Sequence, residues 1–312
     1  MNTLTLNNVS LDGGVVIKRV KEGSSDGNTG GSTSSGWTGH ADIEGLKAIG
    51  WDDEDIAYYQ EHGVNWNEED DEYHKVSDDN KALYGVLTTS NISSYKNRIV
   101  YLPKIDFSGV ENMYGTFMDC YRLVAIPHLD ISAATSIESL FRGCVSLTHI
   151  PMLDTSKVTR MQYTFSGCVQ LAHIPNISTD NVLYVRNIFN NCSSLASLPK
   201  LNFAAATNMT ESFQYCSKLN NIELDFAQKT NTTNCFSSCV NLADVYIKNL
   251  KASISFENSN KLSKESLLYI INNEAAELAI TIKLAHYAYG RLANDVDIVE
   301  ALANHPNVSL AK

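Results

Sequence analysis

Six cysteines recur at a nearly constant interval, and they are the residues whose type and spacing first suggest chemistry. The series is Cys120, Cys144, Cys168, Cys192, Cys216 and Cys239, and Cys235 lies outside it. Thiolates held in register are the ligands of zinc and iron–sulfur sites and the reactants of disulfide exchange. The alternative is a structural row, because a free cysteine behaves as a small hydrophobic residue that is commonly buried.

The cysteines belong to the motif Phe-x-x-Cys-x-x-Leu, which occurs six times. Its phenylalanines are Phe117, Phe141, Phe165, Phe189, Phe213 and Phe236, and its leucines are Leu123, Leu147, Leu171, Leu195, Leu219 and Leu242. Successive phenylalanines are 24, 24, 24, 24 and 23 residues apart. A fixed period in this range indicates stacked copies of one supersecondary unit, which bury a continuous core only together.

The stacking geometry decides between the two roles of the cysteines. Equivalent residues of adjacent coils lie roughly 5 Å apart with parallel Cβ vectors, whereas a disulfide needs Cβ atoms about 3.8 Å apart. We therefore expect a row of buried free thiols that packs inside the stack. On this interpretation the cysteines bind no metal and no cofactor, and they form no disulfide scaffold.

Each of the first four units continues with Ile-Pro or Leu-Pro after its leucine. The prolines are Pro127, Pro151, Pro175 and Pro199. The pattern predicts a strand from each cysteine to this segment, stacked in parallel and ending at or just before the proline, which cannot donate to a ladder. A short helix or irregular turn is expected before the next phenylalanine. The fifth and sixth units lack the proline, as expected for terminal repeats that meet a cap.

The unit resembles the BspA-like class of bacterial leucine-rich repeats, in which Phe-x-x-Cys-x-x-Leu-x-x-Ile recurs at about 23–24 residues. The resemblance covers roughly residues 100–250, and Leu153-Asp-Thr-Ser-Lys-Val-Thr-Arg-Met161 matches a variant of this class. It implies an α/β solenoid: a leucine-rich-repeat-like, right-handed stack of about six coils with a parallel sheet, a helical N-terminal cap and an α/β C-terminal cap. Members are mostly surface-displayed adhesion and binding proteins, and similar repeats occur in phage or prophage structural proteins of gut bacteria.

The chain divides by composition into five parts. Residues 1–21 predict a β-hairpin that anchors the chain, residues 22–39 a flexible Gly/Ser linker, residues 40–99 an acidic helical N-terminal cap, residues 100–250 the solenoid and residues 251–312 the C-terminal cap. A hairpin this small is not stable alone, so we expect it to complete a sheet in a second copy or in a different protein. Neither a secretory signal peptide nor an apolar stretch long enough to span a membrane is visible.

Residues 40–80 carry the charge of the chain: 14 Asp and Glu face two lysines, a net of −12, against −11 for the whole protein. Two helices are expected here, from about Asp42 to Ile49 and from Asp52 or Asp53 to Gly63, with Ser77 capping a third. The acidic runs lack the alternating spacing of a calcium loop, so a solvated surface is favoured over a cation site. So acidic a segment does not favour DNA phosphates as a partner.

The C-terminal cap is expected to cover the final coil and the open edge of its sheet. Ser263 or Ser266 caps a helix that runs through Ile271, residues 279–284 alternate as a strand, residues 295–303 form a second helix, and residues 308–310 form a last short strand. From residue 262 onward the chain is not expected to continue the repeat.

Functional variation is expected where the repeat leaves residues free, on the extended concave surface of the solenoid. The binding candidates there are His128, His149, Met152, His173, Asn176, Ser197, Lys200 and Asn221. His149 and His173 occupy the same repeat position, and a solvent-facing row is favoured over a metal pair because no carboxylate repeats beside them. The candidates are small and polar rather than uniformly basic, which suits a protein or glycan and not a nucleic acid.

No catalytic motif stands out: the chain has no GxSxG, P-loop, HExxH or dinucleotide-binding glycine turn. We therefore expect a non-enzymatic structural and recognition protein of a phage or prophage virion, such as a tail or head appendage, that contacts a host surface or other virion proteins. Residues 1–21 would bind those proteins or a second copy. A bacterial cell-surface adhesin is the first alternative, and a glycan-acting enzyme with unrecognised carboxylates is the second.

Overall fold

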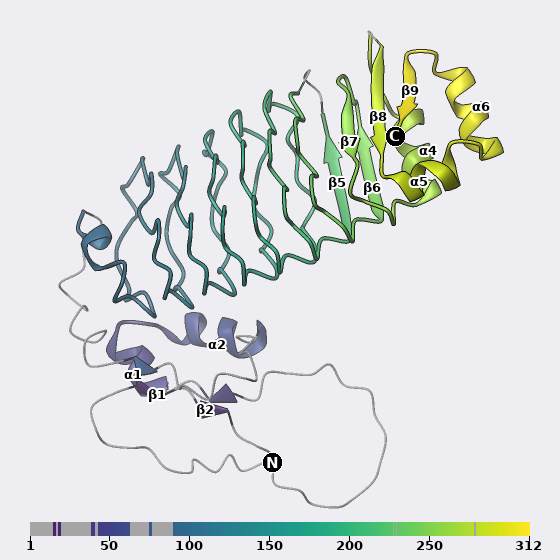
Figure 1. Cartoon of the computed structure of the whole chain (residues 1–312). Coiled ribbons are helices and arrows are strands. Elements are labelled where there is room, and N and C mark those ends of the chain that lie inside the picture. Colours follow the sequence, from purple (N-terminus) through teal and green to yellow (C-terminus); the bar gives the residue numbers. More distant parts are fainter. Residues whose placement is uncertain are drawn as a thin grey trace, which may run out of the picture.

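The computed structural model describes residues 43–62 and 90–312, apart from 227, 229 and 278, together with four two-residue strands near the N-terminus. Within the first range, side chains are described for residues 46–57. Figure 1 shows the coils of the repeat stacked side by side in one row, with the helices and strands of the C-terminal part closing one end.

The phenylalanines of the motif form the spine of the stack. From Phe117 to Phe256, each ring lies nearly parallel to the next, with centroids 5.3 to 5.8 Å apart and interplanar angles of 4° to 20°. Every one of these rings is at most 1% exposed. The phenylalanines of the repeat therefore share one continuous core, and Phe256 extends the row of rings beyond the six motifs.

The most regular run of backbone hydrogen bonds between coils lies on the segment around each phenylalanine. We call this segment, from five residues before the phenylalanine to two after it, the Phe arm. In the third coil the bonds run from Met161 N to Tyr184 O (2.8 Å), Tyr163 N to Arg186 O (3.0 Å), Phe165 N to Ile188 O (2.9 Å) and Gly167 N to Asn190 O (2.7 Å). Every second peptide group thus donates its N–H to the following coil and accepts from the preceding coil through its carbonyl.

Left-handed backbone makes this arrangement possible. The residues two before and two after the phenylalanine have positive φ in all six units: Gly115 and Asp119, Ser139 and Gly143, Tyr163 and Gly167, Asn187 and Asn191, Glu211 and Tyr215, Asn234 and Ser238. The peptide groups between the axial ones close turns within the coil, such as Cys168 N to Phe165 O at 3.0 Å. From four residues before the phenylalanine onward, the axial peptide groups of the Phe arm therefore point the same way, with their N–H groups toward the C-terminal end. At the first residue of the arm the direction is opposite, as Tyr184 N donates back to Thr159 O at 3.3 Å.

The predicted strand on the segment that carries the prolines forms in only part of the stack. We call this segment the Ile-Pro arm (residues 123–129, 147–153, 171–177, 195–201, 219–225 and 242–248). Strand β5 (Asn221–Asp225) pairs in parallel with β6 (Asp244–Lys248), and Glu223 and Tyr246 lie opposite each other. The four coils with a proline form no named strand over this arm in the described structure, so the prediction is wrong for them. Proline supplies no N–H to a ladder, and Glu223 and Tyr246 stand where those coils have proline.

The C-terminal part continues both arms, which the sequence did not reveal. Strands β7 (Ile254–Phe256), β8 (Ile280–Leu284) and β9 (Val308–Ala311) form a parallel sheet in which Ile254 lies beside Ile282 and Ile282 beside Leu310, a repeat of 28 residues. The sheet prolongs the Phe arm, because Phe256 stacks on Phe236. The expectation that repetition ends near residue 262 is therefore wrong.

Helices prolong the other arm. Helix α4 (Lys264–Asn272) packs against β6, and α6 (Val296–Asn304) packs against α4. Ser263 caps α4 and Asp295 caps α6 through side-chain bonds, so both helices and the strands β8 and β9 confirm the predicted C-terminal elements. Helix α5 (His286–Leu292) was not predicted, because no side chain caps its first residue.

The N-terminal part contains the two expected helices, α1 (Ile43–Ala48) and α2 (Asp53–His62), followed by a 3-10 turn, η1 (Ile92–Tyr95). Strand β1 (Val15–Val16) pairs with β4 (Lys75–Val76), and β2 (Lys18–Arg19) pairs with β3 (Gly39–His40). Strands β1 and β2 thus pair with later segments and not with each other. In the described part of residues 1–21, the predicted hairpin is therefore not formed. The remainder of that hairpin, residues 22–38 of the predicted linker and the helix predicted at Ser77 lie outside the described residues. No helix in the described residues is long and apolar enough to cross a bilayer.

Candidate functional site

The cysteine row is a structural part of the core. All seven thiols are free and buried. From Cys144 to Cys239, each thiol of the motif series donates to the carbonyl of the phenylalanine in the preceding coil, at 3.0 to 3.1 Å. Burial raises the pKa of the Cys120 and Cys239 thiols to about 12. Because the thiolate is the reactive form, these side chains are held in the unreactive one.

The three candidate histidines have different surroundings. His149 is only 8% exposed, so the predicted solvent-facing histidine row is wrong at this position. His173 is exposed, and its Nδ1 lies 3.3 Å from the hydroxyl of Ser197 in the next coil. His128 is exposed as well, and its backbone N–H is bonded to Asp55. Within the described residues, no three His, Cys, Asp or Glu side chains gather in a metal-binding arrangement.

The acidic N-terminal helices contact residues 101–104 and the Ile-Pro arm of the first coil. The indole N–H of Trp51 donates to Leu102 O at 2.9 Å, and the Trp51 and Tyr101 rings meet edge to face. The ammonium of Lys104 bridges the carboxylates of Asp52 and Asp55, each at 2.8 Å. The hydrogen bond from Lys104 lowers the pKa of Asp52 to about 2.

Asp55 is the residue that joins this segment to the first coil. Its side chain is completely buried, and one carboxylate oxygen accepts the N–H of His128, the residue directly after Pro127. A buried carboxylate is stable only when paired and hydrogen-bonded, and here Lys104 and the amide together meet that need. The Asp55 carboxylate thus accepts the N–H of His128, which no neighbouring strand accepts in the described structure.

The equivalent amides in the next three coils form a row. Met152, Asn176 and Lys200 each follow a proline, and their N–H groups have no acceptor among the described residues. Their side chains are exposed, Met152 to 59%. We call the exposed surface formed by His128, Met152, Asn176 and Lys200 with His173, Ser197 and Asn221 the Ile-Pro face. At its C-terminal end Lys200 forms an exposed ion pair with Glu223 at 2.7 Å.

The structure places the sequence-predicted candidates on one arm but not on one sheet. Asn221 alone lies in a strand, β5, and the arm continues into α4 and α6 rather than into a sheet. His149 is buried beneath the surface, and the other seven remain exposed or half-exposed. Sequence reasoning missed Asp55, because its contact with His128 spans 73 residues and no local pattern signals it.

Comparison with known proteins adds two likenesses. Residues 111–226 match a family described as a Mycoplasma protein of unknown function, DUF285. Among solved structures, the chain is similar to the crystal structure of a leucine-rich repeat protein of T. pallidum, at 21% identity and a TM-score of 0.41, over 55% of this chain and 80% of that one. No curated protein matches the chain.

Proposed function

We propose that this chain is a non-enzymatic recognition and structural protein that binds another protein through the Ile-Pro face. The observation that carries the proposal is the row of amides after the prolines. The first amide of the row is bound by a carboxylate from a distant segment, and the next three have no acceptor within the described protein. A partner segment laid along the stack meets one such donor in each coil.

The chemistry of this face favours a protein partner with an irregular or extended segment. Donors repeat at the spacing of the coils, roughly 5 Å, which matches backbone carbonyls or carboxylates of a chain crossing the coils. Met152 offers a flexible apolar side chain that adapts to different surfaces. Asn176 and Lys200 add a neutral amide and a charge at the same repeat position.

The setting that we propose is a phage or prophage virion, in which the chain forms part of a tail or head appendage. The support is the resemblance of the repeats to those of phage and prophage structural proteins. A bacterial surface adhesin is the second candidate, and the matched family favours it, because that family is described from a cellular bacterium, Mycoplasma.

The location of the chain separates the two settings. Particles induced from the strain that carries the gene are purified on a density gradient, and the chain is quantified by mass spectrometry in particles and in the cell envelope. Co-purification with the major capsid protein is expected. Enrichment in the envelope of uninduced cells would contradict the virion setting and support the adhesin.

A second experiment tests the face itself. Labelled full-length protein is bound to intact host cells, with Met152→Glu and Asn176→Glu as variants that place negative charge beside the amide row. We expect binding to fall at least tenfold, because a partner's carboxylates or carbonyls are repelled. Tyr114→Glu is the matched control, since Tyr114 is equally exposed (58%) but lies on the Phe arm. Equal loss in all three variants would contradict recognition by the Ile-Pro face.

A further inference from the structure

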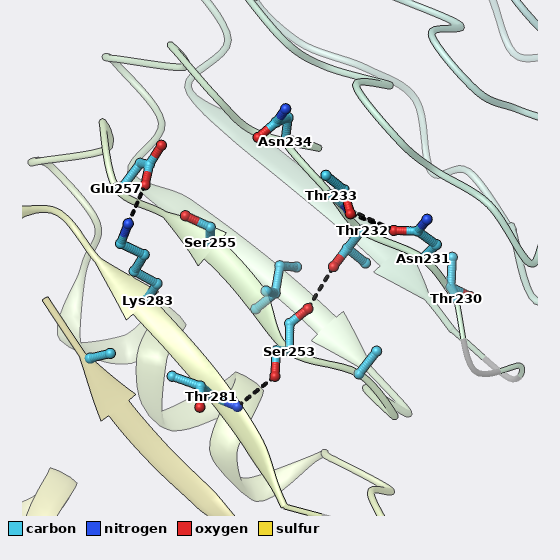
Figure 2. A pocket seen from close by; sticks show the side chains of 13 residues that line it. Thr230, Asn231, Thr232, Thr233, Asn234, Ser253, Ser255, Glu257, Thr281 and Lys283 are labelled. Carbon is cyan, nitrogen blue, oxygen red and sulfur yellow. Dashed lines mark hydrogen bonds and ion pairs between the residues drawn. The ribbon is translucent and has the colours of Figure 1, made fainter.

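A groove lies where the six coils meet the C-terminal sheet, on the Phe arm. Its volume is about 470 Å³, and residues 230–234, 252–255 and 257, 281, 283 and 311 line it. Figure 2 shows that its side chains come from the sixth coil on one side and from β7 and β8 on the other. The groove is therefore separate from the Ile-Pro face, which is on the other arm.

The groove forms because the ladder of the Phe arm stops here. Phe256 follows Phe236 by 20 residues instead of 24, and the following segment is the extended strand β7 rather than a left-handed turn. In the five preceding junctions, axial N–H groups reach carbonyls of the next coil. At this junction the N–H groups of Thr232, Asn234 and Phe236 have no acceptor among the described residues.

Side chains replace only part of the interrupted ladder. The hydroxyl of Thr232 donates to Ser253 O at 2.6 Å, and the amide oxygen of Asn258 accepts the N–H of Ser238 at 3.0 Å. These contacts bridge the two ends of the junction. The donors between them, on Asn234 and Phe236, remain without an acceptor in the described protein.

The direction of the peptide groups in the Phe arm places a partial positive charge at the groove. Aligned peptide groups sum to a partial positive charge where their N–H groups end, as at the N-terminus of a helix. Here the axial peptide groups of six coils point toward the groove. An oxygen acceptor, and above all a carboxylate, is favoured at such a place.

The side chains of the groove add hydroxyl and amide groups of both polarities. The oxygen Oγ of Ser255 is buried and has no hydrogen-bond partner among the described residues, an arrangement that is costly unless another group supplies one. Thr233 and Asn234 lie opposite it on the sixth coil (Figure 2). Lys283 is present as a cation, but it is paired with Glu257 at 2.6 Å.

We propose that this groove binds a sugar that carries a carboxylate, such as a uronic acid unit of a glycan. The carboxylate accepts hydrogen bonds from the N–H groups of Thr232 and Asn234, which both line the groove, and ring hydroxyls bond Ser255 Oγ and the side chains of Thr233 and Asn234. The volume is within the range of small-molecule sites, about 300–1,000 Å³, and it accommodates one or two sugar units. The site goes beyond the proposed protein recognition and does not depend on it.

The test uses the full chain with three probes: glucuronate, glucose and acetate. Amide resonances of Thr232 and Asn234 are followed by NMR during titration. We expect glucuronate to shift both resonances in a saturable manner, at least tenfold more tightly than either glucose or acetate. Equal binding of acetate would overturn the sugar, equal binding of glucose would overturn the carboxylate, and no shift at all would overturn the site.

Two variants locate the site. Ser255→Val removes the buried hydroxyl while keeping a side chain of similar size, and we expect glucuronate to bind at least tenfold more weakly. Ser197→Val on the Ile-Pro arm is the control and should bind as the unchanged chain does. Glu257→Gln releases Lys283 from its ion pair, so affinity for glucuronate should rise. Unchanged binding in Ser255→Val, or weaker binding in Glu257→Gln, would contradict the assignment.

Discussion

The Ile-Pro arm of the first four coils and that of the next two differ in backbone structure, although all six coils share the same Phe arm. The first four have proline and no strand, while β5 and β6 form a regular parallel pair with Glu223 and Tyr246 at the proline position. The proline coils exchange only isolated backbone hydrogen bonds on this arm, such as Ala196 N to Ala172 O at 3.2 Å, whereas the two coils without proline form a regular ladder. The comparison teaches that the Phe arm carries the regular ladder between the coils, and that the Ile-Pro arm of the proline coils presents amides that have no acceptor among the described residues.

The largest effect on stability is expected from removing one ring of the phenylalanine stack. Phe165→Ala removes a ring that is 1% exposed and stacked on Phe141 and Phe189 at 5.8 and 5.3 Å. We expect the free energy of unfolding to fall by about 3–5 kcal/mol, because a cavity remains in a core that both neighbours share. Urea denaturation followed by circular dichroism measures it. Met152→Ala on the Ile-Pro face should change stability by less than about 0.5 kcal/mol.

A proline placed in β6 should give the sixth coil the same missing N–H donor as the first four coils. Asp244 donates its N–H to Asn220, and alternate residues of a parallel strand donate to the same neighbour, so Tyr246 donates to β5. Tyr246→Pro should therefore cost about 2 kcal/mol more than Tyr246→Ala, which removes the ring but keeps the N–H. Denaturation curves of the two variants give the difference.

The control for this experiment lies on the opposite strand. Phe226, directly after β5, donates its N–H to Lys248 O at 3.0 Å. Because only alternate residues donate to the same neighbour, the N–H of Glu223 is not directed at β6. Glu223→Pro should consequently cost less than Tyr246→Pro. An equal cost in both would mean that proline acts through backbone shape and not through the missing donor, and the explanation of the comparison would change.

At the left-handed positions of the Phe arm, replacing glycine by alanine should lower stability, and replacing another residue by glycine should not. Gly143 has a φ of +76°, and a Cβ there would lie 2.5 Å from Oδ1 of Asp119, so Gly143→Ala should destabilise by about 1–2 kcal/mol. Asn191 occupies the equivalent position with a φ of +58° and is exposed. Asn191→Gly should be neutral or stabilising by up to about 1 kcal/mol. Thermal unfolding of both variants checks the prediction.

Sequence reasoning was most successful where side chains alone set the geometry. The Phe-x-x-Cys-x-x-Leu spacing was enough to predict the stack from Phe117 to Phe236, and capping residues Ser263 and Asp295 located α4 and α6. The strand on the Ile-Pro arm was overpredicted, because aliphatic side chains alternate there whether or not backbone bonds join the coils. The 28-residue repeat of β7, β8 and β9 was missed because the motif does not recur in it: β8 has Leu284 in register with Phe256 of β7.

The candidate sites were harder to predict, since both depend on backbone groups. Left-handed conformations at Tyr163, Glu211 and Tyr215 have no sequence signal, because these residues seldom adopt them. The direction of the ladder and its end at Asn234 could therefore not be inferred. A difference in unit length, 20 residues against 24, is the one sequence feature that marks the groove.

The smallest effect on stability is expected at the N-terminal helices, which contact the solenoid through side chains rather than through a backbone ladder. The pKa of Asp52 is lowered to about 2 by Lys104, from an ordinary value of 3.8. A depressed carboxyl pKa stabilises the folded state above pH 3.8, and the stabilisation is lost as pH falls from 3.8 toward 2. Over this window the contact of Trp51 with Leu102 should loosen while the rest of the stack stays folded.

The indole N–H resonance of Trp51, identified by its loss in Trp51→Phe, reports this contact during an acid titration. Lys104→Met is the matched variant: without the ammonium, the titration of Asp52 should move up toward its ordinary value, and the resonance should change at a correspondingly higher pH. If both proteins lose the signal at the same pH, then Lys104 does not set the acid sensitivity of the N-terminal contact. In that case Asp55 and the amide of His128 would hold the segment on the coils by themselves.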